Sequence, residues 1–177
     1  MDGSHQTAPG AGRTAALPEM RLNSLLGSAP TLSIAAAESC SGGGIAQRIT
    51  SVAGSSAYFL GSIVAYSNDA KHRLLMVPTS ILDQFGAVSA ECATAMAEGA
   101  RVAFGASIAV STTGIAGPAG ATVRKPVGLV YIAVSDRSTT RCQEYRFSGD
   151  RRSVVAATTD QALAMLVAAV EAALNIV

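Results

Sequence analysis

Two short apolar runs, each followed at once by a polar, glycine-rich turn, constrain the fold of this chain most strongly. Residues 31–37 (TLSIAAA) precede the turn Glu38–Gly43, and residues 107–113 (SIAVSTT) precede the loop 114–126 (GIAGPAGATVRKP). A short apolar run bounded by turn residues is typical of a buried strand. The sequence therefore predicts two strands inside a sheet, each delivering a polar turn at its end.

The spacing of apolar residues indicates further helices and strands along the rest of the chain. Helices are predicted over residues 14–26, starting near Pro18, and over 45–52, 69–75, 78–82, 91–105 and 151–174. Asn68 is expected to cap the helix over 69–75. Strands are predicted over 57–66 and, as an antiparallel pair, over 127–135 and 140–147. This order predicts an α/β fold, a single-domain three-layer α/β/α sandwich with a mixed sheet.

Composition agrees with one domain of this class. The chain has 177 residues, of which 49% are hydrophobic and only 5% aromatic, enough for one sizeable core built from small and branched side chains. Residues 1–13 are rich in Gly, Ala and polar residues and are expected to form a flexible N-terminal segment. The domain is expected to span residues 14–177.

The charge of the chain limits the kinds of partner that it can bind. The formal net charge is +1, and the longest basic pair is Arg151–Arg152, so a nucleic-acid binder with a basic stripe is not expected. One or two cations still suffice to hold a small anionic ligand.

Uncharged apolar runs are broken well before the ~18 residues of a membrane span. Three cysteines without a CxxC pattern indicate reduced thiols in a cytoplasmic protein.

The turn Glu38–Gly43 places small hydroxyls and glycines at a predicted helix start. Unpaired N–H groups at such a place hold an oxyanion or a phosphate, whereas the simpler interpretation is an ordinary helix cap. In an open α/β sheet, the turns after the strands over 31–37 and 107–113 share one rim, where ligands bind.

A serine nucleophile in this turn needs a base other than histidine. The sequence has no GxSxG motif, and His5 and His72 lack partners for a Ser-His-Asp triad or for a zinc site. Lys71 is one candidate, provided that its pKa falls from ~10.4 toward neutrality. A solvated lysine on a helix surface is the alternative, and spacing leaves both open.

Six motifs occur in the order of a known family. They are A-E-S-C-S-G-G-G (37–44), G-S-S-A-Y-F (54–59), A-Y-S-N-D-A-K (65–71), F-G-A-V-S (85–89), S-T-T-G-I-A-G-P (111–118) and K-P-V-G-L-V-Y-I-A-V (125–134). Together they resemble the CinA C-terminal domain family, whose standalone members include nicotinamide mononucleotide deamidases. Two departures are Ser41, where the family more often has Thr, and Ala121, where a second glycine is usual.

The resemblance implies a metal-independent hydrolase without cofactors that converts nicotinamide mononucleotide to nicotinic acid mononucleotide and ammonia. It implies Ser39 as nucleophile and Lys71 as general base, with Thr113 and Arg151 also catalytic. Ser41 is the fallback nucleophile. It also implies a small-molecule nucleotide as partner and a homo-oligomer. The substrate-binding residues expected beside the catalytic ones are Glu38, Ser41, Gly42, Gly43, Tyr66, Asn68, Gly114 and Gly117.

Several of these roles have structural alternatives. Glu38 is expected to orient Lys71 or bind a ribose hydroxyl, or else to form a buried salt bridge. Arg151 suits a substrate phosphate or the amide oxygen, or is a surface residue near a helix start. Cys40 is expected to be a packing thiol. A CinA-like domain that binds a nucleotide or a partner protein without catalysis is the alternative function.

Overall fold

The computed structural model describes residues 17–27 and 32–175, so the expectation for residues 1–13 lies outside it. The helices are α1 (Pro18–Leu26), α2 (Gly44–Thr50), the 3₁₀ turn η1 (Ser55–Ala57), α3 (Asn68–Leu75), α4 (Thr79–Gln84), α5 (Ala90–Phe104) and α6 (Arg151–Ala173). The strands are β1 (Ile34–Glu38), β2 (Phe59–Val64), β3 (Ile108–Gly114), β4 (Leu129–Ser135) and β5 (Thr140–Arg146).

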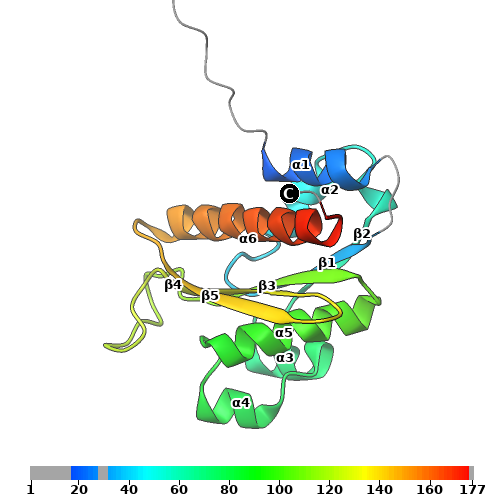
Figure 1. Ribbon diagram of the computed structural model, residues 1–177. Coiled ribbons are helices and arrows are strands. Elements are labelled where there is room, and N and C mark those ends of the chain that lie inside the picture. Colours follow the sequence, from blue (N-terminus) through cyan, green and yellow to red (C-terminus); the bar gives the residue numbers. More distant parts are fainter. Residues whose placement is uncertain (1–16, 28–31, 176–177) are drawn as a thin grey trace, which may run out of the picture.

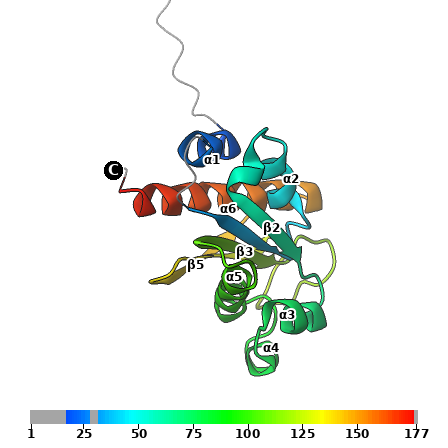
Figure 2. The same cartoon turned by 90° about the vertical axis from the view of Figure 1, so that its right-hand side faces the viewer.

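The strands form one mixed sheet in the order β2-β1-β3-β4-β5. β1 is parallel to both β2 and β3, whereas β4 is antiparallel to β3 and β5 is antiparallel to β4. Helices α1, α2 and α6 lie on one side of this sheet and α3, α4 and α5 on the other (Figure 1; Figure 2). The predicted three-layer α/β/α architecture with a mixed sheet is therefore confirmed.

The alternation of side chains along β1 links the two halves of the core. Ile34 and Ala36 pack into the cluster formed with α1, α2 and α6, while Ala35 and Ala37 pack into the cluster formed with α5. Successive side chains of a strand point to opposite faces of the sheet. Because helices cover both faces, all of β1 is buried and its residues before Glu38 are apolar, as the run TLSIAAA indicated.

Helix α6 is long and apolar enough to cross a membrane by length and composition alone. In this fold it is a core helix, because its buried side chains pack against α1, α2, β3 and β4. The aliphatic part of this buried stripe consists of Val154, Ala162, Leu163, Leu166 and Val170.

The structure corrects the start of one predicted strand and the cap of one predicted helix. The strand predicted over 57–66 begins only at Phe59, because Ser55–Ala57 form the turn η1. Asn68 is the first residue of α3 and not its cap; the hydroxyl of Ser67 accepts the hydrogen bond from the Ala70 amide instead. A serine one residue earlier satisfies the same unpaired helix N–H group.

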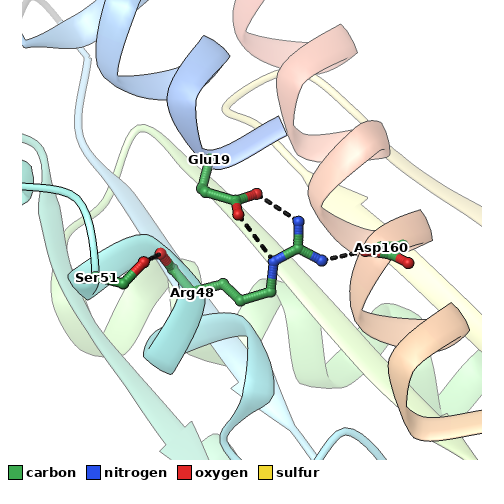
Figure 3. Close-up of polar contacts among 4 residues, drawn as sticks. All are labelled: Glu19, Arg48, Ser51 and Asp160. Carbon is green, nitrogen blue, oxygen red and sulfur yellow. Dashed lines mark hydrogen bonds and ion pairs between the residues drawn. The ribbon is translucent and has the colours of Figure 1, made fainter. Parts of the chain in front are cut away.

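A charged cluster ties α1, α2 and α6 together (Figure 3). The guanidinium of Arg48 donates through Nε to Glu19 Oε1 at 3.1 Å, and it also binds Asp160 on α6. Glu19 is buried, whereas the Asp160 side chain is exposed. Burial raises the pKa of Glu19, but hydrogen bonding and charge from Arg48 outweigh it and the pKa is lowered. The pair Arg48–Glu19 is therefore the part of the cluster that contributes to stability.

Replacing Arg48 by methionine should lower the free energy of unfolding by about 2 kcal/mol, because Glu19 is left buried without its cation. A carboxylate with a lowered pKa in the folded state stabilises fully above its unfolded pKa and loses that contribution as the pH falls through its folded pKa. Urea unfolding at neutral pH and at acid pH checks this: the difference between Arg48→Met and the parent should shrink below pH 4.5, the ordinary pKa of Glu19. An equal difference at both pH values would contradict it.

Candidate active site

A cavity of about 200 Å³ lies where the carboxyl ends of β1, β2 and β3 meet. β1 is followed directly by Ser39, β2 leads into Tyr66, and β3 ends at Thr113 and Gly114. This edge is the switch point of the sheet, because the chain leaves β1 toward β2 on one side and later returns to β3 on the other. The residues that line the cavity are Ser39, Cys40, Tyr66, Asn68, Lys71, Ala87, Val88, Thr113, Gly114, Ala116 and Arg151.

The side chains of Ser39 and Lys71 meet in this cavity. Lys71 Nζ lies 2.9 Å from Ser39 Oγ, and the two residues are only 1% and 8% exposed. Lys71 comes from the first turn of α3, which the Ser67 cap fixes directly after β2. No ion pair within residues 17–27 and 32–175 involves Lys71. The lysine is therefore a buried amine whose closest partners are a hydroxyl and two carbonyl groups.

The surroundings of Lys71 lower the pKa of its amine. Burial lowers its pKa below the ordinary 10.5. Ionised Cys40 and Cys92 would oppose this change, but burial raises the pKa of these thiols to about 12 and about 11. Lys71 Nζ also donates to the carbonyl oxygens of Ala65 at 2.8 Å and Tyr66 at 3.4 Å. As an ammonium, Lys71 donates to Ser39 Oγ as well; once deprotonated, it keeps two hydrogens for the two carbonyls and its lone pair can accept the proton of Ser39.

Thr113 and Arg151 complete the cavity from two other elements. Thr113 lies at the end of β3, is 1% exposed and donates to the carbonyl oxygen of Ala87 at 2.6 Å. Arg151 begins α6 and donates to the carbonyl oxygen of Gly117 at 2.9 Å and to the hydroxyl of Tyr66 at 2.8 Å. These contacts use two of its five N–H groups, so a cation with further donors stands at the mouth of the cavity.

Glu38 has a different role from the substrate-binding one expected of it. Its side chain is fully buried and points to the α2 side of the sheet, where Oε2 accepts from the Ser41 hydroxyl and the Gly43 and Ile45 amides. Oε1 accepts from the Ala46 amide and the Ser62 hydroxyl. It therefore neither orients Lys71 nor forms one of the described ion pairs.

This carboxylate occupies the start of α2. The amides expected to hold an oxyanion or phosphate donate to Glu38 itself, because a carboxylate satisfies the unpaired N–H groups and opposes the positive end of the helix dipole. Ser41 belongs to the same cluster, with its hydroxyl bonded to Glu38 and to Thr112 Oγ1 at 2.7 Å. This position is on the opposite face from Lys71 and outside the residues that line the cavity; the roles of Ser41 in binding substrate and as fallback nucleophile stay predictions.

The glycines of the turn Glu38–Gly43 allow a backbone conformation that other residues rarely adopt. Gly42 and Gly43 have φ values of +62° and +100°, a region that glycine adopts without steric cost. Neither is among the residues that line the cavity, so the structure gives them a conformational role, and the binding role expected of them stays a prediction. Gly114 does line it, and Gly117 contributes the carbonyl group that holds Arg151.

Comparison with known proteins identifies the domain. Residues 19–170 match the family model of the CinA C-terminal domain. The chain belongs to this family. A CinA-like protein of Geobacter sp. (strain M21) is 56% identical over 132 residues, which are 75% of this chain and 32% of that protein. A CinA-like protein of Dictyoglomus thermophilum is 49% identical over 136 residues, 77% of this chain and 33% of that protein. The chain thus spans about a third of the length of these curated relatives.

Solved CinA structures share the whole fold. The competence/damage inducible protein CihA from Agrobacterium tumefaciens has a TM-score of 0.82 at 42% identity and covers 85% of this chain and 92% of its own. A competence-damaged protein (CinA) superfamily protein from Enterobacter cloacae has a TM-score of 0.85 at 28% identity, over 94% of this chain and 99% of its own. The resemblance to the CinA family noted in the sequence is therefore confirmed.

Other nucleophiles and bases are poorly placed in this CinA domain. Cys40 touches the cavity, but burial raises the pKa of its thiol to about 12, so the reactive thiolate is scarce. His72 Nδ1 lies 2.9 Å from the carbonyl oxygen of Val77, away from Ser39. No cluster of three or more His, Cys, Asp or Glu side chains suited to a metal ion occurs in the part of the chain that the structure describes.

Sequence reasoning did not assign Ala87, Val88 and Ala116, which also line the cavity. Ala87 and Val88 lie in the turn before α5, where Ser89 caps the helix through the Cys92 amide. The F-G-A-V-S motif of the CinA family covers this turn, and it was the available signal. Small apolar residues have no reactive group by which a sequence motif could single them out. Their position beside the cavity therefore becomes visible only in the folded structure.

Proposed function

We propose that this CinA domain hydrolyses the carboxamide of nicotinamide mononucleotide, giving nicotinic acid mononucleotide and ammonia. The observation that carries this proposal is the buried contact of 2.9 Å between Lys71 Nζ and Ser39 Oγ. A buried lysine within hydrogen-bond reach of a serine hydroxyl is the pairing that Ser-Lys hydrolases use to activate the serine.

The residues suggest the following steps. Neutral Lys71 takes the proton of Ser39 as Oγ attacks the carboxamide carbon, which gives a tetrahedral oxyanion and a lysine ammonium. The ammonium passes its proton to the amide nitrogen, and the C–N bond breaks. Ammonia departs, and the acyl group stays on Ser39 as an ester. Water then attacks this ester with Lys71 again as the base, and the acid and free Ser39 are released.

The shape and charge of the cavity suit a nucleotide that enters ring first. At about 200 Å³ the cavity has room for the carboxamide-bearing ring, so the ribose and phosphate would lie toward its mouth. Arg151 and Tyr66 stand there, and Tyr66 is 62% exposed, available to pack against the substrate. A guanidinium is a strong partner for a phosphate group.

The rate should rise with pH through the pKa of Lys71. The neutral amine is the active base, and burial lowers the pKa of Lys71 below 10.5, so the midpoint of the rise in kcat should lie on the acid side of that value. Initial rates of ammonia release between about pH 6 and pH 11 measure the midpoint. A rate that falls over this range, or that rises only above pH 10.5, would contradict the assignment of Lys71 as the base.

A panel of substrates tests the function itself. Purified protein should release ammonia from nicotinamide mononucleotide at an equal rate with and without EDTA, and more slowly from free nicotinamide, which lacks the phosphate. Activity that EDTA abolishes would contradict the proposed chemistry. Nucleotide binding without any turnover would favour the alternative, a CinA-like domain that only binds a nucleotide or a partner.

A further inference from the structure

The hydroxyl of Thr113 has a fixed direction. Its Oγ1 lies 2.6 Å from the carbonyl oxygen of Ala87, and a carbonyl oxygen has no hydrogen to give, so the proton of Thr113 must lie on this bond. The side chain is 1% exposed and lines the cavity. Toward the cavity, therefore, Thr113 offers lone pairs and no hydrogen.

The neighbouring hydroxyl of Ser39 lies 2.9 Å from Lys71 Nζ. In the neutral form of Lys71 that the proposed mechanism uses, the proton of Ser39 points to Nζ, and the two amine hydrogens point to the carbonyls of Ala65 and Tyr66. The polar lining next to the nucleophile is thus rich in acceptors, and the charged donor, Arg151, stands at the mouth. A ligand group that donates hydrogen bonds fits this inner end better than an anion does.

We propose that Thr113 is a specificity-determining residue, whose oxygen accepts an N–H of the substrate carboxamide and so selects the amide over the acid. The inference rests on the proposed function and assigns a task to this hydroxyl within it. The acid product has no N–H, and its carboxylate would place charged lone pairs against those of Thr113. The same contact that holds the amide in place therefore promotes release of the product after hydrolysis.

Binding to a Ser39→Ala variant tests the contact without turnover. Three ligands are compared by calorimetry: nicotinamide mononucleotide, nicotinic acid mononucleotide, and 3-acetylpyridine mononucleotide, in which a methyl group replaces the amide nitrogen. The amide should bind about tenfold more tightly than the methyl ketone, which keeps the carbonyl and the size but donates nothing. The acid should bind more weakly than the amide by at least the same factor.

A second substitution assigns the difference to one oxygen. In Ser39→Ala/Thr113→Val the amide and the methyl ketone should bind equally, whereas Ser39→Ala/Thr113→Ser should restore the tenfold preference. Thr112→Val in the same background is the matched control, because Thr112 contacts Ser41 on the other face of β3, and it should leave the preference unchanged.

The outcomes separate this inference from the proposed function. Equal binding of amide and methyl ketone to Ser39→Ala alone would overturn the inference, even if Thr113→Val does not fold. A preference that survives in Thr113→Val would also overturn it. Ammonia release by the parent protein is measured separately, so active protein with no preference refutes only the role of Thr113. If none of the nucleotides binds, the proposed function and the inference fall together.

Discussion

Replacing Lys71 by methionine should lower kcat for nicotinamide mononucleotide about a thousandfold, because general-base catalysis by a positioned group contributes 10²–10⁴-fold. The protein should nevertheless stay folded. Lys71 is 1% exposed, and methionine fills a similar unbranched volume without a buried amine. We expect the free energy of unfolding to stay equal or to rise.

Activity and urea unfolding of the same preparation check both halves of this prediction. Lys125→Met is the matched control, because Lys125 Nζ is exposed and donates only to the carbonyl oxygen of Phe85; its kcat should stay within about threefold of the parent. A Lys71→Met protein that folds and retains most of its activity would remove Lys71 from the mechanism.

Replacing Glu38 by glutamine should lower the free energy of unfolding by about 3 kcal/mol, the largest effect on stability that we expect from a change of so few atoms. Five donors converge on this buried carboxylate. Glutamine keeps one acceptor oxygen but turns an NH₂ group toward hydrogens that already point at it. The start of α2 then loses its cap, and with it the turn that carries Ser39.

Chemical denaturation of Glu38→Gln and of Ser62→Ala separates the cap from its accessory bond. Ser62 supplies one of the five donors from β2, so its loss should cost only about 1 kcal/mol. If the free energy of unfolding falls by only about 1 kcal/mol in both variants, the carboxylate of Glu38 is not what holds the turn in place. Activity should fall further in Glu38→Gln than in Ser62→Ala, since displacement of the turn moves the nucleophile.

The sheet and its polar edge were predictable because burial leaves a strong mark on the sequence. The runs 31–37 and 107–113 are apolar since helices cover both of their faces, and this pattern located β1 and β3. Successive side chains of a strand point to opposite faces of the sheet. Glu38 and Thr112 therefore point toward α2, whereas Ser39 and Thr113 point toward α3 and α5.

The task of Glu38 was not predictable from the order of residues alone. A carboxylate beside a serine suggests chemistry, and only the packing of α2 on β1 shows that this one caps a helix. One signal was present: the residue at the cap position of α2 is Gly43, which has no side-chain acceptor, so another group must supply one. The Ser39–Lys71 pair depended on the family resemblance, because spacing does not fix which face of α3 turns inward.

The most direct test of the account compares Ser39→Ala with Ser41→Ala in ammonia release from nicotinamide mononucleotide. The two serines are two residues apart in the same turn, but only Ser39 contacts Lys71, whereas Ser41 contacts Glu38 and Thr112. Ser39→Ala should lose about a thousandfold or more in kcat, and Ser41→Ala should stay within about tenfold of the parent. An active Ser39→Ala protein beside an inactive, folded Ser41→Ala protein would contradict the account.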